Sequence, residues 1–257
     1  METDLVLARR AALAGAAVGL RYFAALADLP RERKSDGSIV TEADRAVEAA
    51  IREVLTAARP GDAILGEEGG RTDGSRSESR SRQWIIDPID GTALFVAGDD
   101  RWLVLVALEQ DGEIVAGVAA IPSQGRIWWA ERGAGAYEAT IGGPERRISV
   151  ARGHPDELRE SRLGVLPSDL TVAAPLLAVV ADVPWALHPA LLVARGDLDL
   201  ALQTNGQVWD FAATSLIVQE AGGQYSGLDG RTRPAAGPSL YSRSPALHAL
   251  ALKVLGL

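Results

Sequence analysis

The stretch WIIDPIDGTALF (residues 84–95) carries the strongest signal for fold and chemistry in this 257-residue chain. Asp87 and Asp90 stand three residues apart around a proline, directly after an apolar run, and Gly91-Thr92 follows at once. Like charges at this spacing repel each other, and each is costly to bury unless a positive charge lies between them. Asp, Pro and Gly are also ordinary turn residues. The stretch is therefore either a tight, solvated turn after a buried strand or a cation site.

The composition excludes several classes of protein. Hydrophobic residues make up 47% of the chain and charged residues 23%, which is typical of a soluble globular protein. The net charge of −8 argues against a nucleic-acid partner, because phosphate backbones require a basic face. The chain has no cysteine, so disulfides, thiolate zinc sites and cysteine nucleophiles are excluded.

The N-terminal stretch RRAALAGAAVGL (9–20) has some features of an export signal, since two arginines precede an apolar run. However, Arg21 interrupts this run and no clean cleavage site follows. Small and apolar residues recur at helical spacing, which favours a packed first helix from about Thr3 to Ala27. No run is long enough to span a membrane. We expect a cytoplasmic protein with no membrane partner.

The rest of the first half predicts a second helix and then a sheet. This helix begins at TEAD (41–44), with Thr41 as its N-cap and Asp44 in the capping-box position. RTDGSRSESRSR (71–82) has the composition of a low-complexity surface loop. From Trp84 onward, the pattern predicts a meander of strands with Asp-Gly at 111–112 as a hairpin turn.

The second half predicts a mixture of helices and strands. The clearest helices are TVAAPLLAVVA (171–181), WDFAATSLIVQEAGG (209–223) and SPALHALALKVLG (244–256). We predict an α+β layered protein in which residues 1–150 form N-terminal helices plus an antiparallel sheet with the metal-site motifs. Residues 151–257 would form a C-terminal α/β half with the Trp-Asp helix, and the two halves would share one core.

Acidic residues gather at the predicted ends of strands and starts of helices. They are Asp44, Glu67, Glu68, Asp87, Asp90 and Asp210. Each has a structural explanation by itself, since an aspartate at a helix start is often only a cap. Their joint placement at element ends favours a common site. Oxygen ligands without His or Cys suit Mg²⁺, with Mn²⁺ as a substitute, rather than zinc.

The residues beside these aspartates predict phosphoryl chemistry. Gly91-Thr92 resembles a helix start, whose N–H groups bind phosphate oxygens well. Pro88 would stiffen the turn so that the Ile89 carbonyl points inward. Metal ions can hold a phosphate, lower the pKa of a bound water and stabilise the leaving oxygen. Such strong stabilisation is required because monoester hydrolysis is among the slowest uncatalysed reactions.

Three motifs together resemble the signatures of the inositol monophosphatase family: GEE (66–68), WIIDPIDGT (84–92) and WDFAATSLIVQEAGG (209–223). DGSIVTEADRAVEAAIREVL (36–55) also matches, so the resemblance covers nearly the whole chain. WWAERGAGAY (128–137) is similar to actinobacterial members that include histidinol-phosphate phosphatases. The resemblance implies a layered αβαβα sandwich, usually assembled as a homodimer.

The resemblance also implies a role for each matching residue. Two or three Mg²⁺ ions would be held by Glu67, Asp87, the carbonyl of Ile89, Asp90 and Asp210. Glu67 and Thr92 would position the attacking water, with Asp44 hydrogen-bonded to Thr92. The amides of Gly91 and Thr92 would contact the phosphate. No covalent phospho-enzyme is expected, and lithium should inhibit the reaction.

The substrate side departs from the family pattern. Leu94 stands where Asn is common, and Pro184-Trp185 stands where Gly-Ser or Gly-Asp usually faces the substrate. Gln203 replaces a glutamate that holds substrate hydroxyls or an amine in many members. We predict that Leu94, Trp185 and Gln203 bind substrate and that specificity is altered. The alternative is that Trp185 belongs to the core and Gln203 keeps a hydrogen bond to the substrate.

The sequence therefore predicts a Mg²⁺-dependent phosphatase that uses a metal-activated water on a small phosphate monoester. Histidinol phosphate, inositol phosphate, another sugar phosphate and a nucleotide 3′-phosphate all remain open as substrates. The alternative from another class is a non-catalytic phosphate- or metal-binding protein with the same fold. The complete ligand set together with Thr92 and Asp44 argues against it, because such a protein has no physical need for clustered like charges.

Overall fold

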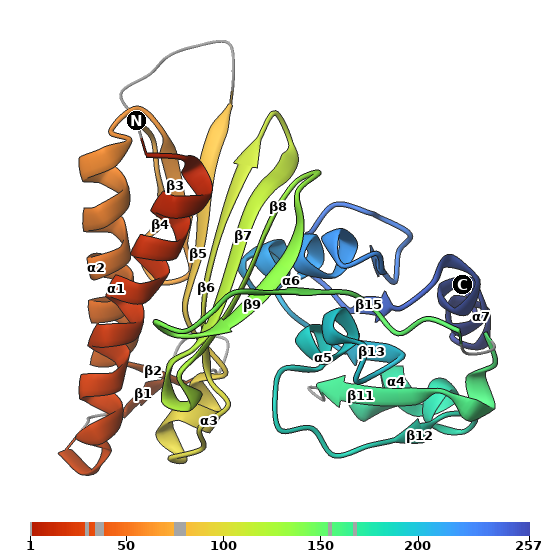
Figure 1. Ribbon diagram of the computed structural model, residues 1–257. Coiled ribbons are helices and arrows are strands. Elements are labelled where there is room, and N and C mark those ends of the chain that lie inside the picture. Colours follow the sequence, from red (N-terminus) through yellow and green to blue (C-terminus); the bar gives the residue numbers. More distant parts are fainter. Residues whose placement is uncertain (1, 29–30, 34–38, 75–80, 154–155, 167–168) are drawn as a thin grey trace. The chain divides into compact units, whose positions relative to one another are not determined.

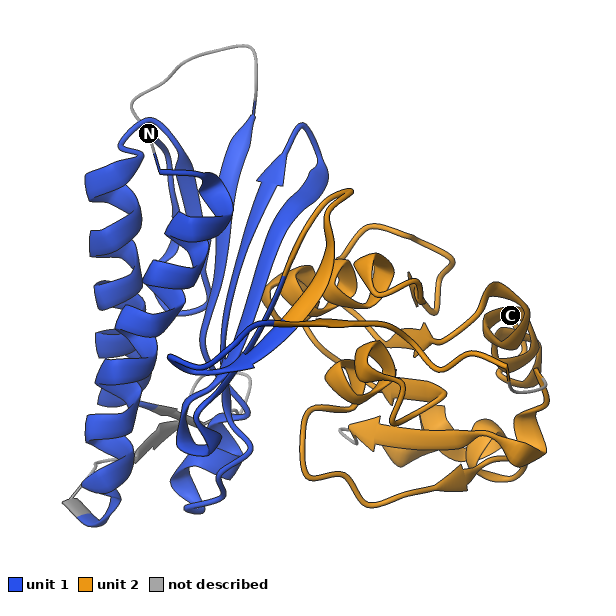
Figure 2. Ribbon diagram, in the orientation of Figure 1, with its two compact units in different colours: residues 1–129, 138–145 blue, residues 130–137, 146–257 orange. Residues whose placement is uncertain are grey.

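In the computed structural model, two long helices from the N-terminal part of the chain cover one face of a large β-sheet (Figure 1). The structure describes residues 2–28, 31–33, 39–74, 81–153, 156–166 and 169–257. The chain divides into two compact units (Figure 2). Unit 1 contains residues 1–129 and 138–145, and unit 2 contains residues 130–137 and 146–257.

Unit 1 consists of the helix pair, a short helix and most of the large sheet. Its helices are α1 (Asp4–Ala24), α2 (Glu42–Ala58) and α3 (Thr92–Val96). A two-stranded ribbon contains β1 (Arg31–Arg33) and β2 (Ile39–Thr41). The sheet strands are β3 (Ala63–Gly66), β4 (Gly70–Thr72), β5 (Arg82–Asp90), β6 (Leu103–Gln110), β7 (Glu113–Ile121), β8 (Arg126–Glu131) and β9 (Gly135–Thr140). They lie in the order β9-β8-β7-β6-β5-β3-β4, and the turn between β8 and β9 belongs to unit 2.

Small residues allow α1 to lie close to its neighbours. A Cβ atom added to Gly15 would lie 2.7 Å from Ile51 of α2, and one added to Gly19 would lie 2.6 Å from Trp102. Overpacking of this kind is destabilising, so these positions require glycine. The predicted packed first helix is therefore confirmed, because its small-residue face is buried against α2 and the sheet. No helix within the described ranges is both long enough and apolar enough to cross a membrane.

Two local predictions for unit 1 are confirmed and one is wrong. The helix α2 has Thr41 as N-cap with Asp44 in a capping box, and β6 and β7 form a hairpin around residues 111–112. However, Asp87 and Asp90 do not lie on a turn after the strand, because β5 continues through both residues. Pairing with β6 holds this segment extended despite its turn-like composition. Of the predicted loop 71–82, residues 75–80 lie outside the described residues.

Unit 2 contains a five-stranded mixed sheet with helices on both faces. Its helices are α4 (Leu170–Leu177), α5 (Pro189–Arg195), α6 (Val208–Glu220) and α7 (Pro245–Val254). The strands of this sheet are β11 (Arg162–Leu166), β12 (Ala181–Asp182), β13 (Leu200–Gln203), β14 (Gln224–Gly227) and β15 (Ser239–Ser242). The short strand β10 (Arg146–Ile148) is not part of it and pairs with β9. The sheet has the order β12-β11-β13-β15-β14. The three predicted helices of this half are present, but the helix predicted for residues 171–181 ends at Leu177, and Ala181 lies in β12. The helix α6 begins at Val208 and ends before Gly222, whose φ is +93°.

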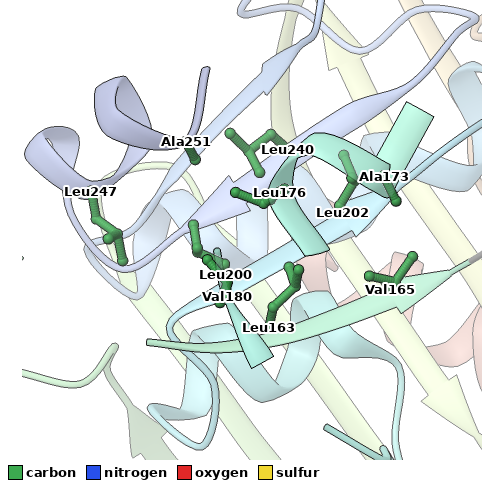
Figure 3. Packing of buried hydrophobic residues seen from close by; sticks show 10 residues of the cluster. All are labelled: Leu163, Val165, Ala173, Leu176, Val180, Leu200, Leu202, Leu240, Leu247 and Ala251. Atoms are coloured by element: carbon green, nitrogen blue, oxygen red, sulfur yellow. The ribbon is translucent and has the colours of Figure 1, made fainter. Parts of the chain in front are cut away.

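Alternate residues of this sheet build an apolar core (Figure 3). Leu163 of β11, Leu200 and Leu202 of β13, and Leu240 of β15 pack against α4 and α7. Side chains alternate between the two faces of a strand, so the intervening residues face the other side. On that side α5 lies directly against β11, since a Cβ added to Gly164 would lie 2.9 Å from Pro189 of α5.

Two histidines of unit 2 are buried in the neutral form. His248 of α7 lies 2.9 Å from the Ser226 hydroxyl through Nε2 and 3.0 Å from the Ser242 hydroxyl through Nδ1. His188 caps α5, where its Nδ1 accepts a hydrogen bond from the Ala190 amide at 3.3 Å. Burial lowers the pKa of each imidazole to about 4, because the charged form loses its hydration.

These pKa values predict that the protein loses stability in mild acid. The unfolded chain takes up protons on His188 and His248 near their ordinary pKa of 6.5, whereas the folded chain does so only near 4. Stability from each neutral histidine is thus fully present above pH 6.5 and is lost as the pH falls toward 4. The expected loss at about pH 5 is about 2 kcal/mol per histidine.

Urea unfolding at about pH 7.5 and about pH 5 measures this effect. The variant His248→Gln should be less stable than wild type at the higher pH, because the two serines lose a well-placed partner. It should also lose about 2 kcal/mol less on acidification, because only one of the two histidines remains to be protonated. An equal pH dependence of wild type and variant would contradict the prediction.

Candidate active site

A bulge in β5 places two aspartates on the same side of the strand. Asp87 pairs with Leu105 of β6, whereas Asp90 pairs with Leu103, so three steps on β5 match two steps on β6. Residues three apart on a regular strand face opposite sides, and the extra residue restores a common side. Pro88 suits this position because it has no N–H to contribute to the ladder. The bulge therefore produces a pair of neighbouring carboxylates.

These two carboxylates are close enough to share a cation. An oxygen of Asp87 lies within 4.8 Å of an oxygen of Asp90. Asp87 is only 1% exposed and Asp90 is half-buried, so their mutual repulsion is poorly screened by solvent. Carboxylate oxygens, together with the carbonyl of the intervening Ile89, are the ligands that Mg²⁺ prefers. The residues of this bulge fit a hard divalent cation.

Glu67 lies beside the bulge because of the register of two parallel strands. Gly66, the last residue of β3, pairs with Ile86 of β5. The Glu67 amide then donates a hydrogen bond to the Ile86 carbonyl at 3.3 Å. Continuing this register by one residue puts Glu67 across from Asp87. The backbone of Glu67 is thus placed next to Asp87 within unit 1, whereas the close carboxylates of this unit are those of Asp87 and Asp90.

The chain turns from β5 into the short helix α3 at Gly91. Gly91 has φ +84°, a left-handed conformation that residues with a side chain rarely adopt, and it forms the N-cap of α3. Phe95 anchors the helix, since its ring centroid lies 5.4 Å from that of Phe23 and 5.0 Å from that of Trp102. The predicted helix start at Gly91-Thr92 is confirmed. Leu94 lies on α3 and is half-buried.

Thr92 connects this helix start to α2. Its hydroxyl oxygen lies 3.1 Å from Asp44 Oδ1 and 3.1 Å from the Ile89 carbonyl oxygen. A hydroxyl has a single proton, so it can donate to only one of these acceptors at a time. When it donates to Asp44, the lone pairs of the Thr92 oxygen can accept a hydrogen bond from a water molecule.

Asp44 is held rigidly in this position. Its Oδ2 accepts hydrogen bonds from the Thr41 amide at 2.8 Å and from the Thr41 hydroxyl at 2.7 Å. Burial raises the pKa of Asp44, although the bonds from Thr41 and Thr92 act in the opposite direction. The carboxylate is therefore both a helix cap and a fixed acceptor for Thr92.

The sequence analysis missed a second buried carboxylate on α2. Glu48 is 2% exposed and accepts hydrogen bonds from the Glu68 and Gly69 amides, both at 2.8 Å. The signal that could have identified it is a charged residue within the apolar stripe of α2, one turn after Asp44. The turn that donates to Glu48 is far from it in the sequence, so this signal would not have identified the Glu68 and Gly69 amides as its partners.

Unit 2 carries the remaining predicted residues. Asp210 is the third residue of α6 and accepts a hydrogen bond from the Gln207 amide at the helix start. Gly206 lies tightly against this start, because an added Cβ would be 2.9 Å from Asp210 Oδ2 and 2.4 Å from Phe211. The carboxylate of Asp210 is thus fixed by the local structure of its own helix.

Trp185 and Gln203 lie near each other along the sheet of unit 2. The Trp185 indole N–H donates to the Val165 carbonyl of β11 at 3.0 Å. The next residue of β11, Leu166, pairs with Gln203 at the end of β13. Gln203 is 8% exposed, and its Oε1 has no hydrogen-bond partner within the described ranges. The Val183 amide donates to the Leu163 carbonyl at 2.9 Å, and the Trp185 indole makes the next bond to β11 beyond β12.

Comparison with known proteins agrees with this geometry. The model of the inositol monophosphatase family matches residues 1–255. The chain is 40% identical over 224 residues to a histidinol-phosphatase of Mycobacterium tuberculosis (strain ATCC 25618 / H37Rv), with 83% of each chain covered. It is also 39% identical over 240 residues to a Streptomyces griseus protein named glucose-1-phosphate thymidylyltransferase. This match covers 90% of the present chain and 88% of the Streptomyces protein.

The fold is also that of solved members. The structure of an inositol monophosphatase from Zymomonas mobilis has a TM-score of 0.81 and 28% identity, covering 99% of this chain and 98% of that one. Unit 1 has a helix layer and a sheet layer, and unit 2 has a sheet between helices, so the predicted α+β fold class is confirmed. With its motifs, fold and carboxylate pair in agreement, the chain belongs to the inositol monophosphatase family of phosphoric monoester hydrolases.

Proposed function

We propose that the chain hydrolyses a small phosphate monoester with Mg²⁺ held by Glu67, Asp87, the Ile89 carbonyl, Asp90 and Asp210. The observation that carries the proposal is the close pair of carboxylates at the β5 bulge beside the helix start at Thr92. Two like charges within 4.8 Å destabilise the fold unless a cation offsets them. The assignment of Asp210 rests on its place in the motif WDFAATSLIVQEAGG.

The residues of unit 1 would handle the phosphate and the water. The amides of Gly91 and Thr92 at the start of α3 would bind phosphate oxygens. Asp44 would accept a hydrogen bond from the Thr92 hydroxyl. The lone pairs of the Thr92 oxygen, together with Glu67, could then orient a water for attack on phosphorus. When bound, the magnesium supplies positive charge that stabilises the phosphate and the leaving oxygen and makes water more acidic. The bond to the leaving oxygen breaks as the new bond from water forms, with no covalent enzyme intermediate.

The substrate wall would come from Leu94, Trp185 and Gln203. The Trp185 indole N–H is already bonded to Val165, so this side chain would offer a ring face rather than a donor. Gln203 would offer a neutral carbonyl oxygen in place of a carboxylate. Histidinol phosphate and inositol phosphate are candidate substrates because relatives carry these names.

Four further points stay predictions: Mn²⁺ in place of Mg²⁺, two or three ions per site, a homodimer and a cytoplasmic location.

The metal assignment predicts strict dependence on a divalent cation. Phosphate release should require Mg²⁺, be restored in part by Mn²⁺, and be suppressed by EDTA, Ca²⁺ and millimolar Li⁺. The assay is phosphate release from histidinol phosphate, myo-inositol 1-phosphate, a sugar phosphate and a nucleotide 3′-phosphate, each with and without Mg²⁺. Full turnover in metal-free buffer would refute the metal role. Binding of metal and phosphate without turnover of any monoester would favour the non-catalytic alternative, and sugar-nucleotide formation without phosphate release would favour a transferase.

The carboxylate pair predicts opposite effects of Asp90→Asn on activity and stability. Turnover should be abolished because a metal ligand is lost, while the melting temperature in EDTA should rise because one of two repelling charges is removed. Differential scanning calorimetry and phosphate release measure the two effects. Glu53→Gln removes a charge from the exposed face of α2 and should change neither quantity. Phosphate release by Asp90→Asn at the wild-type rate would contradict the assignment.

The substrate wall predicts that myo-inositol 1-phosphate is a poor substrate and that a monoester with a flat or apolar group is preferred. Gln203→Glu should improve kcat/KM for an amine or polyol substrate about ten-fold relative to an apolar one, because a charged acceptor replaces a neutral one. Histidinol phosphate should lie between the two extremes in wild type. Steady-state kinetics on both substrate types test this. If inositol 1-phosphate equals the best substrate of wild type, the pocket assignment is wrong, whereas the metal chemistry is unaffected.

A further inference from the structure

Glu48 on α2 lies under the turn that carries Glu67. The Glu48 Oε2 atom accepts the amide of Glu68 and Oε1 accepts the amide of Gly69, each at 2.8 Å. The side chain is 2% exposed, and Arg52 donates to Oε1 through Nε at 2.7 Å. Hydrogen bonds from backbone amides to a buried carboxylate are short and strong. The turn is thus bound to α2 by a charge-assisted clamp.

The turn lies so close to this carboxylate that side chains are excluded on both sides of it. A Cβ added to Gly66 would lie 2.4 Å from the Glu48 carboxyl carbon, and one added to Gly69 would lie 2.7 Å from Oε1. Contacts this short do not occur for real Cβ atoms, so the two glycines are required by the clamp. The sequence G-E-E-G therefore fits around Glu48 as a unit.

Arg52 extends the clamp to the next strand. Its Nη2 donates to the Gly70 carbonyl at 2.6 Å and its Nη1 donates to the Thr72 hydroxyl at 2.9 Å. Both acceptors belong to β4, which returns antiparallel beside β3. The turn is consequently held at its centre by Glu48 and at its far end by Arg52.

We propose that Glu48 is a positioning residue for Glu67, an inference that rests on the proposed role of Glu67 as ligand and water-orienting group. The Glu67 amide is fixed to β5 through the Ile86 carbonyl at 3.3 Å. The following amide, that of Glu68, is fixed to α2 through Glu48. Both peptide planes that flank the Glu67 Cα atom are therefore held, which sets φ and ψ of Glu67 and the direction of its side chain.

This role differs from general stabilisation, because it acts on one ligand of the metal site. Residues that orient metal ligands typically change metal affinity or activity by about 10- to 100-fold when they are replaced. Glu48→Gln keeps the size of the side chain but removes the charge and one of the two oxygen acceptors. We expect the exchange of the Glu68 and Gly69 amides to accelerate and Mn²⁺ to bind about ten-fold more weakly.

Glu220 provides a matched control. Its carboxylate also accepts two backbone amides, those of Gly133 at 2.8 Å and Gly135 at 2.9 Å. The turn that it holds, between β8 and β9, carries none of the proposed ligands. Glu220→Gln should accelerate amide exchange at residues 133–135 and leave Mn²⁺ affinity at the wild-type value.

Hydrogen exchange by mass spectrometry and calorimetric titration with Mn²⁺ in the absence of substrate give the two readouts. Faster exchange at residues 68 and 69 with unchanged Mn²⁺ affinity in Glu48→Gln would overturn the positioning role. Equal loss of Mn²⁺ affinity in the Glu48 and Glu220 variants would also overturn it, because the effect would then be one of general stability. Should Glu48→Gln fail to fold, Gly69→Ala disturbs the same clamp from the side of the turn and is expected to weaken Mn²⁺ binding.

Arg52→Met separates positioning from long-range charge. If Glu48 acted only by attracting the metal through its charge, removal of the neighbouring Arg52 cation would strengthen Mn²⁺ binding. The positioning role predicts weaker binding, because Glu48 and β4 lose a hydrogen-bond partner. Tighter binding would therefore overturn the proposal. Failure of the proposed function is distinguishable, since it would appear as no phosphate release by wild type from any monoester, while the exchange and Mn²⁺ measurements do not require turnover.

Discussion

Two aspartate carboxylates held on one side of a bulged strand impose the main constraint on unit 1. Asp87 and Asp90 cannot move apart, because β6 pairs with β5 on both sides of the bulge. Asp87 is almost fully buried and Asp90 is half-buried, so water screens the repulsion between the two charges poorly. Such an arrangement is unfavourable for folding and is retained where a cation compensates it. The neighbouring turn and helix start are therefore best understood as supports for a site that the fold must keep in a strained electrostatic state.

The helix α2 provides those supports through two acidic residues one turn apart. Asp44 receives the hydroxyl of Thr92 from the start of α3, and Glu48 receives the amides of the turn after β3. Residues four apart lie on the same face of a helix, so one rigid element fixes two loops at once. The same helix packs against α1, where Gly15 permits close approach to Ile51. Packing far from the bulge thus determines how precisely its surroundings are held.

The sequence allowed prediction wherever the signal was local. Thr41 and Asp44 specify a capping box within four residues, and Asp111-Gly112 specifies a hairpin turn with two positive φ angles. The extension of β5 through Asp90 could not be predicted, because Asp-Pro-Ile-Asp has a turn-like composition and its strand conformation depends on pairing with β6. Glu48 was missed for a similar reason, since its partners lie about twenty residues away along the chain. Motif resemblance predicted the ligands, whereas only the three-dimensional structure shows what holds these residues in place.

The proposed substrate wall lies partly on a different part of the chain, where the structural constraints are weaker. The proposed metal ligands of the β5 bulge are fixed by backbone pairing. In unit 2, Gln203 ends β13, and Trp185 lies three residues after the two-residue strand β12. The Trp185 indole donates to Val165 of β11 beyond the last paired residue of β12. In the proposed wall, Trp185 would therefore offer a ring face, and the buried Gln203 Oε1 would accept a hydrogen bond. Such a wall would favour a substrate with a flat group that stacks on the ring and donates one hydrogen bond. It would disfavour a polyol, whose many hydroxyls each need a hydrogen-bond partner. Substitutions at these two positions would leave the bulge in β5 unchanged, so the proposed substrate wall can vary independently of the proposed metal site.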